Sequence, residues 1–98
     1  MSRAERIADM KNDVVAWRRD LHTHPELLYD VVRTAGVVAD RLRSFGADEV
    51  VTGIGRTGVV GLIRGKIRGK DAGPVIGLRA DMDALPIEEE TNLPYRSA

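Results

Sequence analysis

GVVGLIRGKIRGKDAGPVIGLRA, residues 58–80, decides the fold. It holds two apolar runs, residues 58–65 and residues 74–80, and the link between them is rich in glycine and charge. Strand-like runs joined by such a link predict a β-hairpin. The shorter run DEVVT, residues 48–52, predicts one further strand just before the hairpin.

The N-terminal residues predict a helix. Ser2 followed by Glu5 is a capping-box pattern. Pro25 pushes the residue before it out of the helical region, so the helix should end near residues 22–24. Apolar residues recur between these limits at spacings of three and four, as an amphipathic helix requires: Ile7, Met10, Val14, Trp17 and Leu21.

A second helix is predicted between this one and the first strand. It should end at Gly46, which suits a left-handed C-terminal cap. Its apolar stripe is Val31, Ala35, Val38, Leu42 and Phe45. Residues 85–98 carry two prolines and no sustained period, and so predict a loop.

The predicted fold class is therefore α/β, with two N-terminal helices followed by a β-strand and a β-hairpin. Three strands with no element closing the far edge of the sheet make an incomplete layer. We therefore expect residues 1–98 to be part of a larger domain.

Composition argues against several classes of function. The 98 residues include 15 basic and 15 acidic side chains, so a nucleic-acid groove or an anionic membrane surface is not expected. No apolar run approaches the ~20 residues of a membrane span. The absence of cysteine excludes a disulfide framework and a thiolate metal site on this chain, and it fits a cytoplasmic location.

GIGRTG, residues 53–58, matches the glycine pattern of a dinucleotide site. Such a site needs a helix after the glycines, whose N-terminus receives the pyrophosphate. Here the following residues predict a strand instead. We therefore interpret the motif as a turn between strands.

HTHPE, residues 22–26, offers two imidazoles and a carboxylate, which suit zinc. The alternative is a polar helix terminus, where a histidine interacts with the last carbonyls and Pro25 fixes the exit. We favour the helix terminus, because zinc needs three or four ligands and the sequence identifies no others.

Asp81 and Asp83 follow the last apolar run directly. At the end of a strand their side chains would share one face. Three interpretations stay open: magnesium-assisted phosphoryl transfer through an aspartyl nucleophile, a place at the rim of a hydrolytic metal centre, or capping of backbone N–H groups. The first interpretation is typical of haloacid-dehalogenase-like phosphatases, in which the strand before Asp-x-Asp usually opens the fold. It is disfavoured here, because two predicted helices and two predicted strands precede that strand.

Three ordered blocks strongly resemble the beginning of the hippurate hydrolase-like amidohydrolases, the N-acyl-amino-acid and indoleacetyl-amino-acid hydrolase branch of the aminoacylase-type dinuclear metallopeptidases. The blocks are WRRDLHTHPELLYDVVRTAG (17–36), LRSFGADEVVTGIGRTGVVGLIRG (42–65) and IGLRADMDALPIEEETNLPYRS (76–97). One departure from the family lies at residues 28–31, where Leu-Tyr-Asp-Val replaces the commoner Gly-Phe-Glu-Glu.

The resemblance implies a two-domain enzyme that cleaves the amide of a small N-acyl amino acid, such as hippurate. The enzyme would hold two divalent metal ions, which could be zinc, manganese, cobalt or nickel. A metal-bound water, activated by a glutamate, would attack the acyl carbonyl. On this resemblance residues 1–98 are an N-terminal fragment of a zinc-peptidase-like α/β catalytic domain. The resemblance implies a complete enzyme with a smaller domain that serves for dimerisation, in a possible homodimer, and as a lid. That domain and the rest of the catalytic domain are absent from these 98 residues, so the fragment alone is expected to be inactive.

The resemblance also assigns the two aspartates. Aligned on Pro86, Asp83 takes the place of an aspartate that orients a metal ligand, and Asp81 replaces a histidine ligand of the wider superfamily. This branch finds its first metal ligands in a Cys-Gly-His-Asp run further along, which these 98 residues lack. Asp83 and Asp81 are therefore expected to support a metal site whose ligands lie beyond residue 98. The alternative hypothesis is a non-catalytic module that pairs with another chain through an exposed sheet edge.

Overall fold

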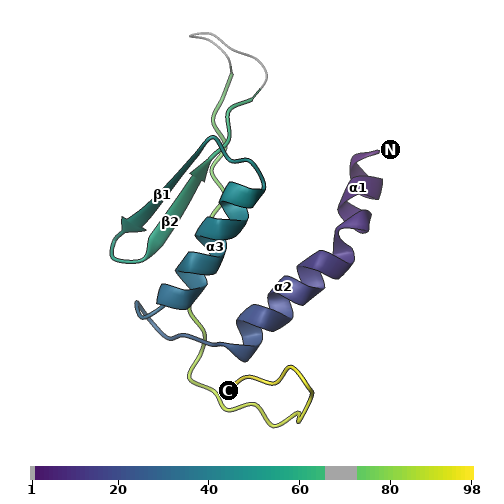
Figure 1. The fold of residues 1–98 in the computed structure, drawn as a ribbon, viewed down its shortest axis with the longest axis vertical. Coiled ribbons are helices and arrows are strands. Elements are labelled where there is room, and N and C mark those ends of the chain that lie inside the picture. The colour runs from purple at the N-terminus through teal and green to yellow at the C-terminus, as the bar shows by residue number, and fades with distance from the viewer. Residues whose placement is uncertain (1, 66–72) are drawn as a thin grey trace. The chain divides into compact units, whose positions relative to one another are not determined.

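The computed structural model describes residues 2–65 and 73–98 (Figure 1). The chain divides into two compact units. The first unit consists of Met1–Pro25 and Ala84–Ala98, and the second unit is Glu26–Asp83. Each unit is described separately below.

The first unit contains two short helices, α1 (Arg3–Asp9) and α2 (Lys11–Thr23), where one continuous helix was predicted. The capping box is confirmed, because the Ser2 side chain accepts from the Glu5 N–H at 3.1 Å and the Glu5 carboxylate accepts from the Ser2 N–H. The predicted continuity is wrong. Met10 donates its N–H to the Ile7 carbonyl at 3.1 Å, so the chain tightens there into a turn with three-residue spacing before α2 begins.

Helix α3 (Val32–Ser44) opens the second unit and ends as predicted. Gly46 has a φ of +87°, the left-handed conformation that glycine adopts without a steric penalty. Its N–H donates to the Arg43 carbonyl at 3.1 Å, and the Ala47 N–H donates to the Leu42 carbonyl at 3.1 Å. These two bonds form a Schellman motif, which satisfies the last carbonyls of α3.

The sheet of the second unit is an antiparallel pair, β1 (Glu49–Ile54) and β2 (Gly58–Leu62). Gly55 and Arg56 between the strands have φ values of +56° and +89°. These two left-handed residues help to reverse the chain within the three-residue link, residues 55–57, since Ile54 pairs with Gly58. The interpretation of GIGRTG as a turn between strands is therefore confirmed.

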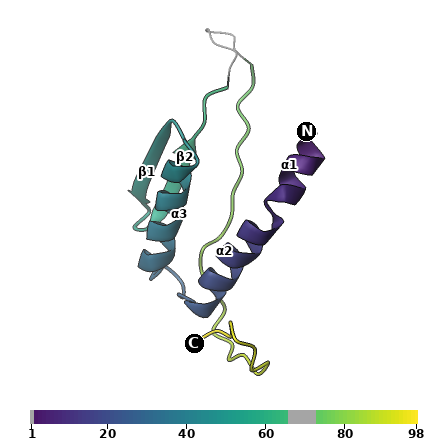
Figure 2. The ribbon, with the colours of Figure 1, turned by 45° about the vertical axis from the view of Figure 1, so that its right-hand side comes forward.

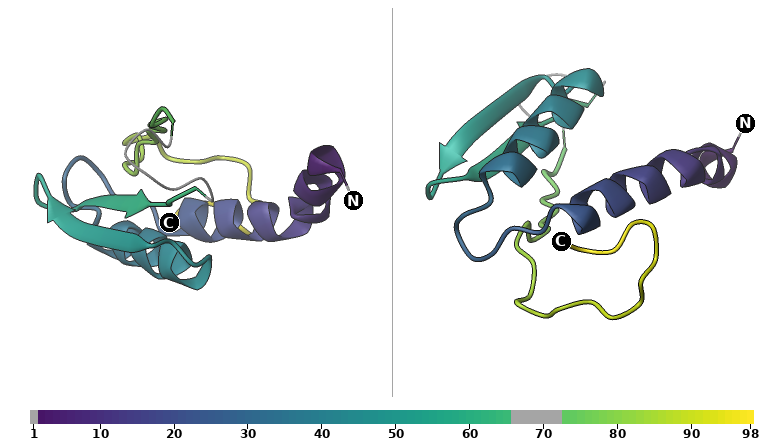
Figure 3. Two further views of the ribbon diagram at one scale, coloured as in Figure 1. Left: turned by 90° about the horizontal axis from the view of Figure 1, so that it is seen from above. Right: turned by 60° about the horizontal axis from the view of Figure 1, so that its bottom comes forward.

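Helix α3 packs on one face of this hairpin (Figures 2 and 3). A Cβ atom at Gly61 would lie 3.0 Å from a methyl carbon of Leu42, so glycine permits the close approach of strand and helix. Few of the described residues are buried. Val31 and Ala39 are each 3 % exposed and Thr34 is 5 % exposed. The described core is thus a thin layer between α3 and one face of the sheet.

The predicted hairpin between residues 58–65 and 74–80 does not form. Among the described residues the sheet has only β1 and β2, and residues 73–80 belong to no strand. The link, residues 66–72, lies outside the described residues. Val75, Ile76 and Leu78 are 91 %, 82 % and 97 % exposed.

One physical reason accounts for this error. A strand that is apolar on both faces is stabilised only when both faces are covered, and residues 75–78 are not covered in this unit.

The C-terminal residues 85–98 contain no helix and no strand, as predicted. Within residues 2–65 and 73–98, none of the helices has the length and apolar character needed to cross a membrane.

Leu28 is strained, and this gives a first prediction. Its φ is +53°, although leucine is disfavoured in the left-handed region, and its side chain is exposed, so little burial offsets the cost. We expect Leu28→Gly to raise the free energy of unfolding by about 1 kcal/mol, measured by urea denaturation. The matched control is the neighbouring Leu27→Gly, which should lower it, because the backbone of Leu27 is not in that region. Destabilisation by Leu28→Gly would contradict the account.

Candidate functional site

The two predicted site aspartates lie on an exposed segment of the second unit. Asp81 Oδ1 pairs with Arg79 Nη2 at 2.8 Å, and both side chains are exposed. Asp83 is exposed as well. Neither residue lies in a strand, so the alternation that would place both carboxylates on one face does not apply.

Among the described residues, the two aspartates have no companions that would complete a metal site. Among residues 2–65 and 73–98, no group of three or more His, Cys, Asp or Glu side chains could hold a metal ion. A protein site for zinc generally uses three or four such ligands. The described residues therefore do not by themselves fit the two metal ions that the family resemblance implies.

The HTHPE motif separates into three different roles. His24 caps the end of α2, where its Nδ1 donates to the Asp20 carbonyl at 2.9 Å and lies 3.6 Å from Asp20 Oδ1. The Thr23 hydroxyl donates to the same carbonyl at 2.9 Å. These contacts support the helix-terminus interpretation of the motif over the zinc interpretation.

Glu26 caps the N-terminus of α3. Its Oε1 accepts from the Thr34 N–H at 2.6 Å and from the Thr34 hydroxyl at 2.7 Å, and its Oε2 accepts from the Arg33 N–H at 3.1 Å. Val31 at the N-cap position has no side chain that could satisfy these amides. The Glu26 carboxylate therefore replaces the usual capping residue from eight positions away in sequence.

The hydrogen bond from the Thr34 hydroxyl is the largest influence on Glu26, and it holds the pKa of this carboxyl below the usual 4.5. The two backbone N–H groups and the nearby Arg33 act in the same direction, against partial desolvation. Glu26 is thus an ionised structural group at neutral pH.

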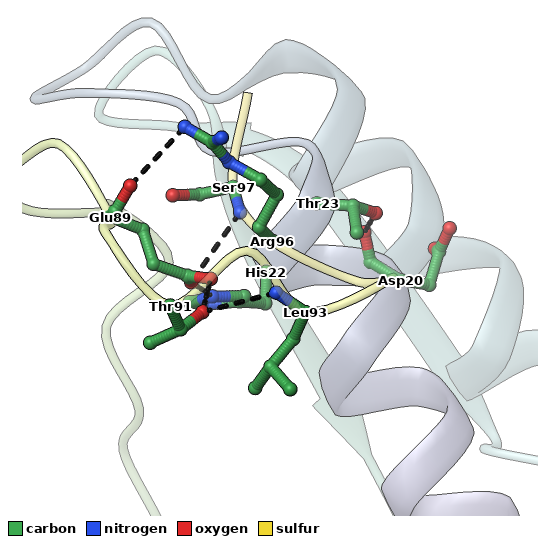
Figure 4. Close-up of polar contacts among 8 residues, drawn as sticks. All are labelled: Asp20, His22, Thr23, Glu89, Thr91, Leu93, Arg96 and Ser97. Carbon is green, nitrogen blue, oxygen red and sulfur yellow. Dashed lines mark hydrogen bonds and ion pairs between the residues drawn. The ribbon is translucent and has the colours of Figure 1, made fainter.

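His22 contacts Glu89, which was not among the predicted site residues. Its Nε2 contacts Glu89 Oε1 within the first unit, and the Thr91 hydroxyl donates to Glu89 Oε2 (Figure 4). The Ser97 N–H adds a contact of 3.5 Å to Glu89 Oε1. The side chain of Glu89 is 14 % exposed. No local pattern reveals this pair, because its partners lie 67 residues apart.

The surroundings of Glu89 favour its charged form. The hydrogen bond from Thr91 and then the contact with His22 hold the pKa of the Glu89 carboxyl below 4.5. A carboxylate with this environment is suited to holding a loop in place and unsuited to donating a proton near neutral pH.

Two further contacts attach the C-terminal loop to α2 and to itself. The Arg19 guanidinium lies 4.2 Å from the centroid of the Tyr95 ring, a cation–π geometry. Arg96 donates to the Glu89 carbonyl at 3.2 Å and to Asn92 Oδ1 at 3.1 Å. Residues 89–97 therefore form an ordered strap whose role, from its contacts, is structural.

Comparison with known proteins confirms the family resemblance. The chain is 47 % identical over 91 residues to a hippurate hydrolase from Campylobacter jejuni, and 42 % identical over 91 residues to an N-acyl-L-amino acid amidohydrolase from Geobacillus stearothermophilus. It is 44 % identical over 99 residues to thermostable carboxypeptidase 1 from Saccharolobus solfataricus. Each match covers 93 % of this chain. The chain therefore resembles hydrolases that act on amides.

The shared region is a minor part of these relatives. The chain spans 22 %, 23 % and 24 % of their lengths, respectively. No family model matches the chain, and no solved structure matches it.

The cap of α3 gives a second prediction. Glu26→Gln removes the charge and leaves one acceptor oxygen for three donors, so the free energy of unfolding at pH 7 should fall by about 1 kcal/mol. Because the folded-state pKa of Glu26 is lowered, its contribution is present above pH 4.5 and is lost as the pH falls through that lowered pKa.

Urea denaturation between pH 3 and pH 7 measures both effects. The difference between wild type and Glu26→Gln should shrink toward the acid end. Glu88→Gln, in an exposed loop position, is the control and should change little. A Glu26→Gln penalty that is the same at every pH would show that the charge of Glu26 does not contribute.

Proposed function

We propose that this chain is part of a metal-dependent amidohydrolase that cleaves the amide bond of N-acyl amino acids of the hippurate type. The observation that carries the proposal is the 47 % identity to a hippurate hydrolase over 93 % of the chain. The same region is shared with an N-acyl-L-amino acid amidohydrolase, which supports a small N-acylated substrate.

In this proposal residues 1–98 belong to a zinc-peptidase-like α/β catalytic domain. The mix of three helices with a sheet that is covered on one face supports a partial domain. The remaining catalytic residues and a separate dimerisation and lid domain would come from chain outside these 98 residues. The assembled enzyme would be a cytoplasmic homodimer.

The proposal gives Asp83 a positioning role and Asp81 a supporting one. Both carboxylates are exposed on a segment that no other part of its own unit covers, as a residue needs if it is to meet groups from further chain. The two divalent metal ions and their ligands would be supplied by that further chain, because the described residues assemble no group able to hold a metal ion.

The isolated chain should be inactive, since it holds no such group among its described residues. Purified residues 1–98 should release no glycine from hippurate, with zinc, manganese, cobalt or nickel added. The intact Campylobacter jejuni relative serves as the positive control in the same assay. Metal-dependent turnover by the pure chain would refute the claim that the chemistry needs further residues.

A chimera tests the positive side of the proposal. Replacing the matching 91 residues of the Campylobacter jejuni hippurate hydrolase with this chain should give an enzyme that hydrolyses hippurate. Within it, Asp83→Ala should reduce kcat/KM by about 10- to 100-fold, and Asp81→Ala should have a smaller effect.

The matched control in the chimera is Asp30→Ala, which removes another exposed aspartate of the same chain. It should leave kcat/KM unchanged. A folded chimera without hydrolase activity would argue against the proposed function. Equal losses of kcat/KM for Asp83→Ala and Asp30→Ala would argue against the positioning role of Asp83 and would leave the proposed function standing.

A further inference from the structure

The Glu89 side chain lies at the centre of a polar cluster in the first unit (Figure 4). Its carboxylate contacts the His22 ring of α2. The same carboxylate accepts from the Thr91 hydroxyl and from the Ser97 N–H. Since Thr91 and Ser97 lie near the two ends of the strap, residues 89–97, one carboxylate joins both ends of the strap to one side chain of α2.

Hydrogen bonds within the strap make it a closed loop. The Arg96 N–H donates to the Leu93 carbonyl at 3.0 Å, and the Arg96 guanidinium donates to the Glu89 carbonyl at 3.2 Å. Asn92, which accepts from the same guanidinium, has a φ of +57°, a left-handed conformation that asparagine tolerates. Because the loop is closed by its own bonds, a contact that fixes Glu89 places the whole strap.

The pair of His22 and Glu89 is a partly buried attachment of the strap to α2. The Glu89 side chain is 14 % exposed. Removing either member leaves the other without this partner, and for a partly buried polar group that costs more than the loss of an exposed contact. The cation–π contact of Arg19 with Tyr95 also joins the strap to α2. Loss of the pair should therefore loosen the strap without unfolding α2.

We propose that His22 and Glu89 are positioning residues of the amidohydrolase, because by fixing the strap on α2 they fix where the chain continues after Ala98. This inference rests on the proposed function, in which the remaining catalytic residues come from chain outside these 98 residues. Catalytic residues that follow the strap would depend on its placement, and a displacement of about 1 Å can slow a reaction about 100-fold. Neither His22 nor Glu89 would touch the substrate.

The first test measures backbone order in the 98-residue chain by NMR relaxation. In wild type the order parameters of residues 91–97 should lie near the value of about 0.85 that is typical of a rigid backbone. His22→Ala and Glu89→Ala should each lower them to about 0.6 or below, because each variant detaches the strap at Glu89. Circular dichroism should show that both variants keep their helices.

Two variants are matched controls for this measurement. His24→Ala removes a histidine from the same end of α2, whose contacts with Asp20 and Thr23 lie within that helix end. Glu90→Ala removes the exposed neighbour of Glu89. Both controls should leave the order parameters of the strap unchanged.

The second test places the same four changes in the chimera with the Campylobacter jejuni hippurate hydrolase. His22→Ala and Glu89→Ala should each lower kcat by about 10- to 100-fold and change KM by less than about twofold, because they displace reacting groups and not substrate contacts. The double variant should lose no more than either single one, since the two residues act as one pair. His24→Ala and Glu90→Ala should keep the kcat of the unmutated chimera.

The outcomes separate this inference from the proposed function. A folded, unmutated chimera that does not hydrolyse hippurate would overturn the proposed function and the positioning role with it. In an active chimera, a strap that stays ordered in His22→Ala and Glu89→Ala would overturn the positioning role alone. A loosened strap with an unchanged kcat, or a loss of kcat as large in His24→Ala as in His22→Ala, would overturn it as well.

Discussion

The second unit depends on the packing of one helix on one face of a two-stranded sheet. Helix α3 and the hairpin bring Leu42 against Gly61, and this close contact is possible because glycine has no side chain. A sheet of two strands with one covered face can bury little. The small core and the uncovered segment after β2 both follow from that single layer.

The start of α3 shows how the chain reaches this packing. Pro25 ends the first helical region, and Glu26 then folds toward the amides of Arg33 and Thr34. The five residues between Glu26 and α3 must therefore close a tight loop, and Leu28 takes a left-handed conformation within it. Leu28, which stands where the hippurate hydrolase-like family that the chain resembles more often has glycine, is thus a residue that the loop strains.

Local patterns in the sequence predicted the local structure well. The capping box at Ser2, the glycine cap at Gly46 and the turn in GIGRTG depend on nearby residues, and each was confirmed. The break at Met10 had no such signal, since neither proline nor glycine lies there. The pairing of residues 58–65 with 74–80 depends on what covers the strands, which local sequence does not determine.

The contacts of the candidate site divide in the same way, into local ones that the sequence predicted and long-range ones that it did not. The separate roles of His24 and Glu26 are local to the ends of two helices, but the contact between His22 and Glu89 spans 67 residues and had no pattern to reveal it. Asp81 and Asp83 were predicted from their spacing and from family resemblance. The structure shows both side chains exposed, and their role in a metal site stays a prediction that rests on the resemblance.

The central claim is that these 98 residues are part of a larger amidohydrolase, and the most direct measurement is the nucleotide sequence that follows the codon for Ala98. The account predicts an open reading frame that continues into a Cys-Gly-His-Asp run. A stop codon directly after Ala98 would contradict the claim.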